Sequence, residues 1–493
     1  MKNHQTVNLK TIAWDAMEKY GFHPRFPGQV LQELKSLPAE FRYQGEKGVR
    51  DLRGLLWSSI DNFDSLDLDQ IECSERVNDD DILVRVAIAD VDYFVPKHSH
   101  ADRHAAHNGT SVYTGIITFP MFPEELSEGV SSLLPGQDCM AVIIEYTVKS
   151  DGSLLPGPVY RGIVRNKAKL IYEEVGEWLE GTRDIPASVA RVPDLEEQIL
   201  MQNKAAQLLR RRRREHGALD LETLESQVVV ADDLVTDLAV QRQDAARCLI
   251  EEFMVAANGT VVAFLEKAGL PMIHRIVRVP KYWEEIRLTA TSYGFTLPHE
   301  PDARSLSDFL VARRKEDPER FPDLSLTVVK LMGAGEYVPY KPGKDPIGHF
   351  ALAVTDYTHG TAPNRRYVDL IIQRLVKSVL DKTKSPYSFQ ELAQRAEWLT
   401  SREKASNKVE RFMRKAAAAV LLKPRLGETF EGFVTGASEK GTYVRLITPP
   451  AEGRVMYREK GLKVGQKVVV RLRKTDPYNG HIDFEYMKDN RDK

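Results

Sequence analysis

Residues 60–70 read Ile-Asp-Asn-Phe-Asp-Ser-Leu-Asp-Leu-Asp-Gln and place four carboxylates within nine residues: Asp61, Asp64, Asp67 and Asp69. Their gaps of three, three and two residues fit neither a helix nor a strand, so no regular element carries all four on one face. We expect a loop after a strand over residues 55–60 to bring them together. Apolar residues interleave with the acids, which favours a buried loop, and burying four carboxylates without a cation would be costly.

Taken alone, this acidic run has three interpretations. It could be a solvated acidic turn, a calcium-binding loop, or an oxygen-ligand site for another hard divalent cation. Glu72 stands at the twelfth position from Asp61, as a calcium loop requires. However, Phe63 and Leu66 occupy positions where such a loop has a ligand and a glycine, which argues against calcium.

A basic pair stands nearly 300 residues further on, in the stretch 357–370, Tyr-Thr-His-Gly-Thr-Ala-Pro-Asn-Arg-Arg-Tyr-Val-Asp-Leu. Paired arginines such as Arg365 and Arg366 grip phosphate groups. The alternative for this pair is a salt bridge to the nearby Asp369. A site that joined these arginines to the acidic run would be suited to cutting a phosphodiester.

The bulk composition bounds the class of protein. The 493 residues, 42% hydrophobic and 28% charged, suit a folded protein with one large domain and accessory domains. We see no run near the roughly 18 apolar residues of a membrane span and no secretory signal, so we expect no membrane association. Three widely spaced cysteines form no metal motif and suit the cytoplasm: Cys73, Cys139 and Cys248.

Charge is distributed unevenly although the net charge is only −2. Residues 51–130 hold 16 Asp/Glu against 5 Lys/Arg, whereas residues 401–493 hold 21 Lys/Arg against 12 Asp/Glu. A basic terminal module is an electrostatic footprint for polyanions. An acidic segment that also bound RNA would need a metal ion to neutralise it.

We expect an α+β fold with three domains. Residues 1–50 read as a small helical domain, either a helix-turn-helix or winged-helix unit or a helical cap on the next domain. Residues 51–425 begin with strands and continue with long helices over 194–214, 241–268 and 366–381, which predicts one large domain. Residues 426–493 contain five short alternating strands separated by glycine turns, the pattern of a five-stranded OB barrel.

Several blocks in order resemble the signature of the RNase II (RNB) exoribonuclease family over residues 51–400. The blocks are Asp61, Asp67 and Asp69; Ile88-Ala-Asp90-Val; Gly109-Thr-Ser-Val-Tyr113; Pro120-Met-Phe-Pro-Glu-Glu-Leu-Ser127; Gly217-Ala-Leu; Glu251-Glu-Phe-Met-Val-Ala-Ala-Asn258; and His359-Gly-Thr-Ala-Pro-Asn-Arg365-Arg366-Tyr-Val-Asp369-Leu. The terminal barrel resembles the RNA-binding OB fold found at the same end of that family.

The resemblance implies an RNB-type catalytic domain that processively hydrolyses single-stranded RNA from its 3′ end and releases nucleoside 5′-monophosphates. It implies a Mg²⁺ site, with Mn²⁺ as the alternative, drawn from five residues: Asp61, Asp64, Asp67, Asp69 and Gln70. Asp67, Asp69, Arg365 and Arg366 would be the catalytic residues, with the arginines stabilising charge on the phosphate.

RNA-binding candidates follow from the same blocks and from the charge pattern. Tyr113 matches an aromatic that stacks on the terminal base, with an ordinary core or rim residue at a strand end as the alternative. Asp90 matches a position near the catalytic acids, with a turn cap as the alternative. Further candidates are Arg210, which opens a run of five arginines at a helix end, the barrel residues Phe433, Tyr443 and Arg445, and Glu410, which resembles a late acidic position of the family.

The chain also departs from the family pattern. The family's aspartate loop ends in two adjacent acids, whereas the second position here is Gln70; in the arginine block Gly360, Ala362 and Asn364 differ from the usual residues. The amino end reads as helical where many members of the family have cold-shock barrels, and our hypothesis is that this keeps the channel entrance accessible to structured RNA with a 3′ overhang. Gln70 motivates the alternative of a catalytically weakened RNB-like RNA-binding regulator. A DNA-binding helix-turn-helix regulator would rest on residues 9–50 alone. We expect a cytoplasmic monomer.

Overall fold

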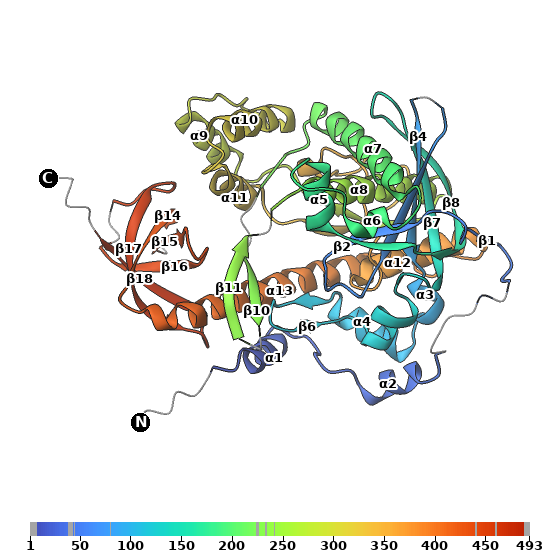
Figure 1. Cartoon of the computed structure of the whole chain (residues 1–493), viewed down its shortest axis with the longest axis horizontal. Coiled ribbons are helices and arrows are strands. Elements are labelled where there is room, and N and C mark those ends of the chain that lie inside the picture. Colours follow the sequence, from blue (N-terminus) through green and yellow to red (C-terminus); the bar gives the residue numbers. More distant parts are fainter. Residues whose placement is uncertain are drawn as a thin grey trace.

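The computed structural model describes residues 7–37, 43, 45–78, 80–222, 226–231, 234–240, 242–438, 441–458 and 461–487. A large sheet with helices forms one end of the molecule and a closed barrel forms the other (Figure 1). The long helix α13 (Phe389–Leu422) runs between them and contacts barrel strands as well as strands of the larger domain. The predicted α+β architecture is therefore confirmed.

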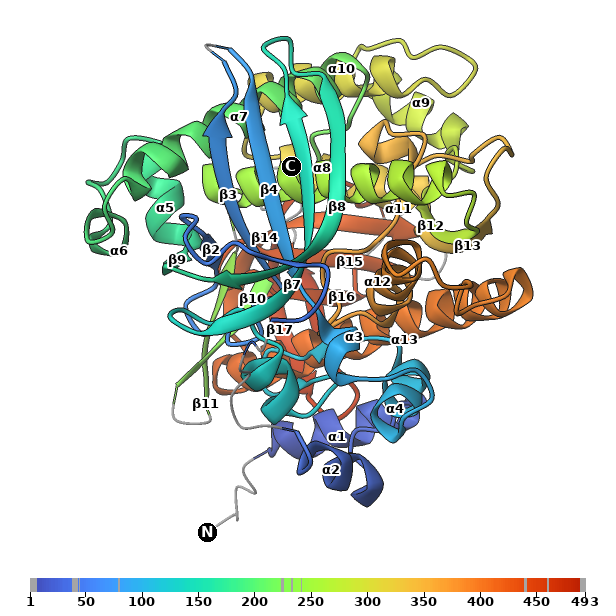
Figure 2. The same ribbon diagram turned by 90° about the vertical axis from the view of Figure 1, so that its right-hand side faces the viewer.

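The main sheet has seven strands in the order β1-β8-β7-β4-β3-β2-β9. Pairing is antiparallel from β2 to β8, and the two outermost strands join in parallel (Figure 2). The strands are β1 (Val49–Asp51), β2 (Ser58–Asp61), β3 (Gln70–Arg76), β4 (Ile82–Ala89), β7 (Asp138–Val148), β8 (Leu154–Arg165) and β9 (Ala168–Ile171). The strand expected over residues 55–60 is thus shifted toward the acidic run, and its last residue is Asp61.

Helices cover one face of this sheet: α5 (Tyr172–Leu179), α7 (Leu195–Glu215), α8 (Ala245–Lys267) and α12 (Tyr367–Leu380). The helix α8 starts where the Asp244 side chain accepts a hydrogen bond from the Arg247 N–H. Its length and composition would suffice to cross a membrane, so the expectation that no such run exists was wrong. It is nevertheless a core helix, because it packs on β7 and β8 with Phe253 and Leu265 fully buried.

Two parts of the larger domain were not predicted from the sequence. Between β4 and β7 lie α3 (Val91–Phe94), α4 (His100–Asn108), β5 (Val112–Tyr113), β6 (Thr118–Phe119) and a π-helical segment, Glu125–Val130. Between β12 (Met272–Ile276) and β13 (Glu336–Tyr340) lie α9 (Trp283–Ser292), α10 (Ala303–Glu316) and α11 (Phe321–Met332), which enclose a small core of their own. The remaining elements are α6 (Ala187–Ala190), two short 3-10 helices (Phe350–Leu352 and Lys423–Arg425) and a hairpin of β10 (Ser226–Ala231) and β11 (Leu234–Val240). The hairpin packs on α13.

The carboxy-terminal segment forms the predicted five-stranded closed barrel, in the order β14-β15-β16-β18-β17. Its strands are β14 (Thr429–Ser438), β15 (Gly441–Leu446), β16 (Glu452–Tyr457), β17 (Lys467–Asp476) and β18 (His481–Met487). Alternate residues such as Val468, Val470 and Leu472 point into the barrel core, as the period of two in the sequence indicates.

The amino-terminal helices α1 (Leu9–Lys19) and α2 (Gly28–Leu34) are separated by a turn that contains Gly21 at φ +78°. The helix α1 packs on α13, whereas α2 packs on α4. Because each helix lies against a different part of the larger domain, the two helices do not form the helix-turn-helix considered above. They cover the larger domain instead. Most of the polar stretch 38–44 lies outside the described residues.

Candidate active site

The acidic loop runs from Asp61, the last residue of β2, to Asp69, just before β3. Lys169 of β9 fastens it, because its Nζ donates hydrogen bonds to the carbonyls of Phe63, at 2.8 Å, and Ser65. The Ser132 hydroxyl fastens the second half through the carbonyl of Leu66 and the N–H of Leu68. A loop held at both ends keeps its carboxylates in fixed positions.

The prediction of a wholly buried loop was only partly right. Leu68 is fully buried, but Phe63 and Leu66 are 78% and 50% exposed. Asp64 is exposed as well, whereas Asp69 is buried and Asp61 and Asp67 are half-buried. Asp64 is therefore the exposed member of the group, although it lies close enough to Asp67 for its charge to contribute to the raised pKa of Asp67.

Asp69 is the most enclosed of the acids and has an unusual set of neighbours. Its Oδ1 accepts a hydrogen bond of 2.9 Å from the backbone N–H of Asn364, and its Oδ2 lies 3.6 Å from Nε of Arg365. That Oδ2 is buried and has no hydrogen-bond partner. Burial raises the pKa of Asp69 well above its ordinary value, although the Arg365 charge opposes the shift.

Asp61 and Asp67 share the electrostatic environment of Asp69. Burial, followed by the Asp67 charge, raises the pKa of Asp61 to about 6. Burial also raises the pKa of Asp67, whose Oδ2 accepts a 3.4 Å hydrogen bond from the Tyr113 hydroxyl. Three clustered carboxylates that resist ionisation form a site short of positive charge.

The two arginines of the basic block have different roles in the structure. Asp369, fully buried in the first turn of α12, accepts hydrogen bonds of 2.8 Å from the N–H groups of Thr361 and Ala362 and from Arg366 Nη2. Arg366 therefore forms the salt bridge to Asp369 that the alternative predicted, and this contact closes the loop. Arg365 is left with a 45% exposed side chain beside Asp69.

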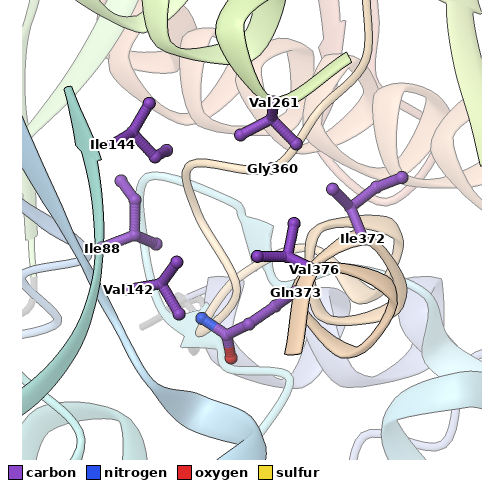
Figure 3. A pocket seen from close by; sticks show the side chains of 8 residues that line it. All are labelled: Ile88, Val142, Ile144, Val261, Gly360, Ile372, Gln373 and Val376. Atoms are coloured by element: carbon purple, nitrogen blue, oxygen red, sulfur yellow. The ribbon is translucent and has the colours of Figure 1, made fainter. Parts of the chain in front are cut away.

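The loop that carries the arginines is seated on the core. The Gly360 N–H donates to Asn258 Oδ1 of α8 at 2.8 Å, and a Cβ on Gly360 would lie 3.0 Å from Ile372 of α12. A small apolar gap beside Gly360 is lined by Ile88 and Val142 from the sheet and by residues of α8 and α12 (Figure 3). It lacks charged groups, and it is a gap in the core packing that carries no catalytic chemistry.

Tyr113 lies at the rim of the acidic site, 42% exposed, with its hydroxyl beside Asp67. Its backbone N–H donates to Glu410 Oε1 of α13 at 3.2 Å, and the same oxygen accepts from the Ser406 hydroxyl. Tyr113 is therefore a rim residue and not a core residue, so the ordinary rim alternative and base stacking both stay open. Glu410 supports Tyr113 from behind, which connects the late acidic position to the site.

Two of the predicted RNA-binding residues are used elsewhere in the fold. Asp90 is fully buried, caps α3 through the Tyr93 N–H and forms a 2.8 Å salt bridge with Lys377. Arg210 is half-buried and forms a 2.8 Å ion pair with Asp220. Each charge is therefore already paired inside the protein, and a role in RNA binding stays a prediction for both residues.

The barrel candidates divide in the same way. Phe433 is buried, and Arg445 forms a bidentate ion pair with Asp323 of α11, so neither presents a free surface for RNA. Tyr443 is half-buried, with Lys415 Nζ 5.9 Å from its ring centre, and stays a candidate.

Three residues at or near the site were given no such place in the sequence analysis. Lys169 fastens the loop, the Asn364 N–H binds Asp69, and Glu72 of β3 is buried close enough to Asp61 for the two charges to interact. Lys169 and Asn364 had no local signal, because their contacts join residues more than 100 positions apart. Glu72 could have been found, since it stands two positions after Gln70 on the same strand.

The donor set fits a divalent cation in type and charge. Within the described ranges, no three His, Cys, Asp or Glu side chains already surround a common ion position. Protein groups partner the acids instead, as with Tyr113 on Asp67. The buried, unpartnered Oδ2 of Asp69 and the excess of carboxylates around one arginine are nevertheless what a hard cation would satisfy.

Comparison with known proteins agrees with this arrangement. The RNB domain family matches residues 49–382, and the RNase II-type exonuclease C-terminal S1 domain matches residues 428–487. The chain therefore belongs to the RNB family and is a hydrolase of the exoribonuclease class.

Among its relatives is ribonuclease R of Thermotoga maritima, 29% identical over 94% of this chain and 68% of that protein. The fold of this chain is similar to that of Mycoplasma genitalium RNase R in complex with ribose methylated single-stranded RNA. The two are 22% identical with a TM-score of 0.87, and the match covers 97% of this chain and 78% of that one. The complex of that enzyme with double-stranded RNA gives 23% identity and a TM-score of 0.86, covering 97% and 83%.

Proposed function

We propose that this protein is a divalent-metal-dependent 3′→5′ exoribonuclease that releases nucleoside 5′-monophosphates from RNA. The observation that carries the proposal is the meeting of the buried Asp69, with its unpartnered Oδ2, and the exposed Arg365 at 3.6 Å. The buried Asp69 oxygen without a hydrogen-bond partner is complementary to a cation. The exposed Arg365 guanidinium is complementary to a phosphate.

The residues divide the chemistry between them. Asp61, Asp67 and Asp69 would hold Mg²⁺, which when bound activates water and neutralises the phosphate. Arg365 stabilises the charge that develops on the phosphate oxygens during hydrolysis. Asp369 and Asn258 hold the arginine loop, so that Arg365 is aimed before substrate arrives.

Sequence-independent binding of the RNA end is the role we assign to Tyr113. A half-exposed ring at the rim can stack on any base, at roughly 1–3 kcal/mol per base. The relatives solved with single-stranded and double-stranded RNA support RNA as the partner. We further propose that the protein works as a cytoplasmic monomer; its three cysteines are free.

We expect the purified chain to shorten 5′-labelled single-stranded RNA in the presence of Mg²⁺ and to release mononucleotides, with no cleavage in EDTA. Because hydrolysis starts at the 3′ end, the 5′ label should stay on a ladder of shrinking products. Thin-layer chromatography of body-labelled RNA identifies the nucleotides. Binding of RNA without mononucleotide release would reject the enzyme and favour the RNA-binding regulator that the neutral Gln70 suggests.

The pKa shifts predict how metal binding stabilises the protein as the pH changes. The folded pKa of Asp61, about 6, exceeds its ordinary value of 3.8, so the metal-free fold loses stability as the pH rises from 3.8 to about 6. A bound cation removes this loss of stability. Below the folded pKa, protons compete with the cation for the Asp61 carboxylate. The rise in Tm caused by Mg²⁺ should therefore be larger at about pH 7.5 than at about pH 5.

Differential scanning fluorimetry of two variants tests this expectation. Asp61→Asn should reduce the difference between the two pH values, whereas Asp64→Asn, at the exposed position of the same loop, should keep it. An equal Mg²⁺ effect on wild type at both pH values would contradict the assignment of Asp61 to the cation site.

A further inference from the structure

Ser131 and Ser132 directly follow the π-helical segment and contact both halves of the candidate site. The Ser132 hydroxyl donates a hydrogen bond of 2.6 Å to the carbonyl of Leu66 and accepts one of 2.9 Å from the N–H of Leu68, so it holds the acidic loop. The Ser131 hydroxyl donates to Oδ1 of Asn364, in the arginine loop, at 2.7 Å. One dipeptide therefore holds two loops that meet across 295 positions of the sequence.

The dipeptide is itself anchored in the core. Ser131 is 2% exposed and Ser132 is fully buried. The Ser131 N–H donates to the carbonyl of the buried Leu126 at 3.1 Å, and its hydroxyl lies 2.6 Å from the same oxygen. The hydroxyl hydrogen is thus shared between the Leu126 and Asn364 oxygens, a three-centre hydrogen bond of the kind common at helix ends. Asn364, which is 1% exposed, is thereby tied to a segment that is packed in the core.

Each loop has other anchors, but these lie on different elements. Lys169 of β9 holds the acidic loop, whereas Asn258 of α8 holds the arginine loop. The hydrogen bond of 2.9 Å from the Asn364 N–H to Asp69 joins the two loops directly, but it depends on the acid that the proposed chemistry uses. The links through the two serines contain no titratable group, so they hold the loops together whatever the charge on Asp69.

We propose that Ser131 is a positioning residue: through Asn364 it fixes the arginine loop to the segment that also holds the acidic loop, and so sets the spacing between Arg365 and Asp69. The inference rests on the proposed function, since it concerns the same reaction. Ser131 acts through its neighbour and not on the phosphate itself. A shift of about 1 Å in the placement of a catalytic group can cost on the order of 10²-fold in rate.

Single-turnover hydrolysis of single-stranded RNA by the full chain tests this role. Ser131→Ala should lower the rate by about 10- to 100-fold, because Asn364 loses its hydrogen bond to the serine, while the RNA affinity stays near that of wild type. In an Arg365→Ala background the same substitution should have a much smaller effect, since the group that it positions is gone. A serine that only supports packing would lower the rate by the same factor in both backgrounds.

Two further variants separate the link from general packing. Ser127→Ala removes a buried hydroxyl from the same π-helical segment, but one that lies 3.4 Å from the nearby carbonyls of Phe122 and Pro123, and it should keep the wild-type rate. Asn364→Leu removes the other end of the link while its backbone N–H stays on Asp69. It should lower the rate as Ser131→Ala does, and the double variant should lose no more than either single one.

Tm measured on the same samples shows which variants are folded at the assay temperature. If Ser131→Ala is not, Asn364→Leu in the wild-type and Arg365→Ala backgrounds decides the question. A wild-type rate in the folded variant, or an equal loss in both backgrounds, would overturn the inference and leave the proposed function intact. Failure of wild type itself to hydrolyse RNA would instead reject the proposed function.

Discussion

Asp69→Asn should lower RNA hydrolysis by on the order of 10³-fold or more while leaving RNA affinity nearly unchanged. The substitution preserves the shape of the side chain, and its Oδ1 can still accept the hydrogen bond from the Asn364 N–H. It removes the charge that faces Arg365 and the buried oxygen that a cation would use. Loss of a group that acts on the reacting phosphate, and not on the rest of the RNA, affects turnover far more than binding.

Single-turnover hydrolysis and a fluorescence anisotropy titration with the same RNA measure the two quantities. Asp64→Asn is the matched control, since it removes a carboxylate from the exposed part of the same loop and should retain most of the activity. Equal losses in both variants would mean that the loop acts through its total charge and not through the position of Asp69. Intact hydrolysis in Asp69→Asn would remove this residue from the catalytic machinery.

The ordered blocks together predicted that the acidic run and the arginine block lie in one site, although they are far apart in the sequence. Asp61, Asp67 and Asp69 meet Arg365 in the structure, although they lie nearly 300 residues apart. Neither block alone decided its role, because the acidic run could have been a solvated turn and the arginine pair could have formed a structural salt bridge. For Arg366 the salt-bridge alternative was correct, because Asp369 lies three residues on along the same helical turn.

Three of the predicted RNA-binding residues are engaged in ion pairs that the sequence did not show. Asp90, Arg210 and Arg445 were judged as single charges, and each is paired with a residue that only the fold brings near. The partner of Asp90 is Lys377, 287 residues away, and the partner of Arg445 lies on a helix of the unforeseen insertion. A pattern of charged residues predicts an RNA-binding surface only when the oppositely charged partners of those residues in the fold are known.

This pairing also changes how the basic carboxy-terminal module is understood. Arg445 joins the barrel to α11 through Asp323, and Lys415 of α13 forms an ion pair of 3.5 Å with the barrel residue Glu452. Part of the positive charge therefore fixes the barrel on the larger domain. The excess of lysine and arginine counted in the sequence overstates the charge that RNA meets.

Arg365→Ala should lower the rate of hydrolysis by about 10²- to 10³-fold, with a smaller effect on RNA affinity. The side chain is 45% exposed and forms no hydrogen bond that holds the fold, so its removal should leave Tm almost unchanged. Arg365→Lys keeps the charge but loses the planar fork that matches phosphate, and should recover only part of the rate. Single-turnover rates of the three proteins, with Tm measured on the same samples, give the comparison.

Arg366→Met is the contrasting variant because it differs by one position along the same loop. Arg366 is paired with the fully buried Asp369, so its removal leaves an uncompensated charge and should cost about 3–5 kcal/mol of folding stability. The two arginines thus predict opposite signatures: loss of rate at constant Tm for Arg365, and loss of Tm for Arg366. A fall in Tm with Arg365→Ala, or a fall in rate at constant Tm with Arg366→Met, would reverse the roles that the structure gives them.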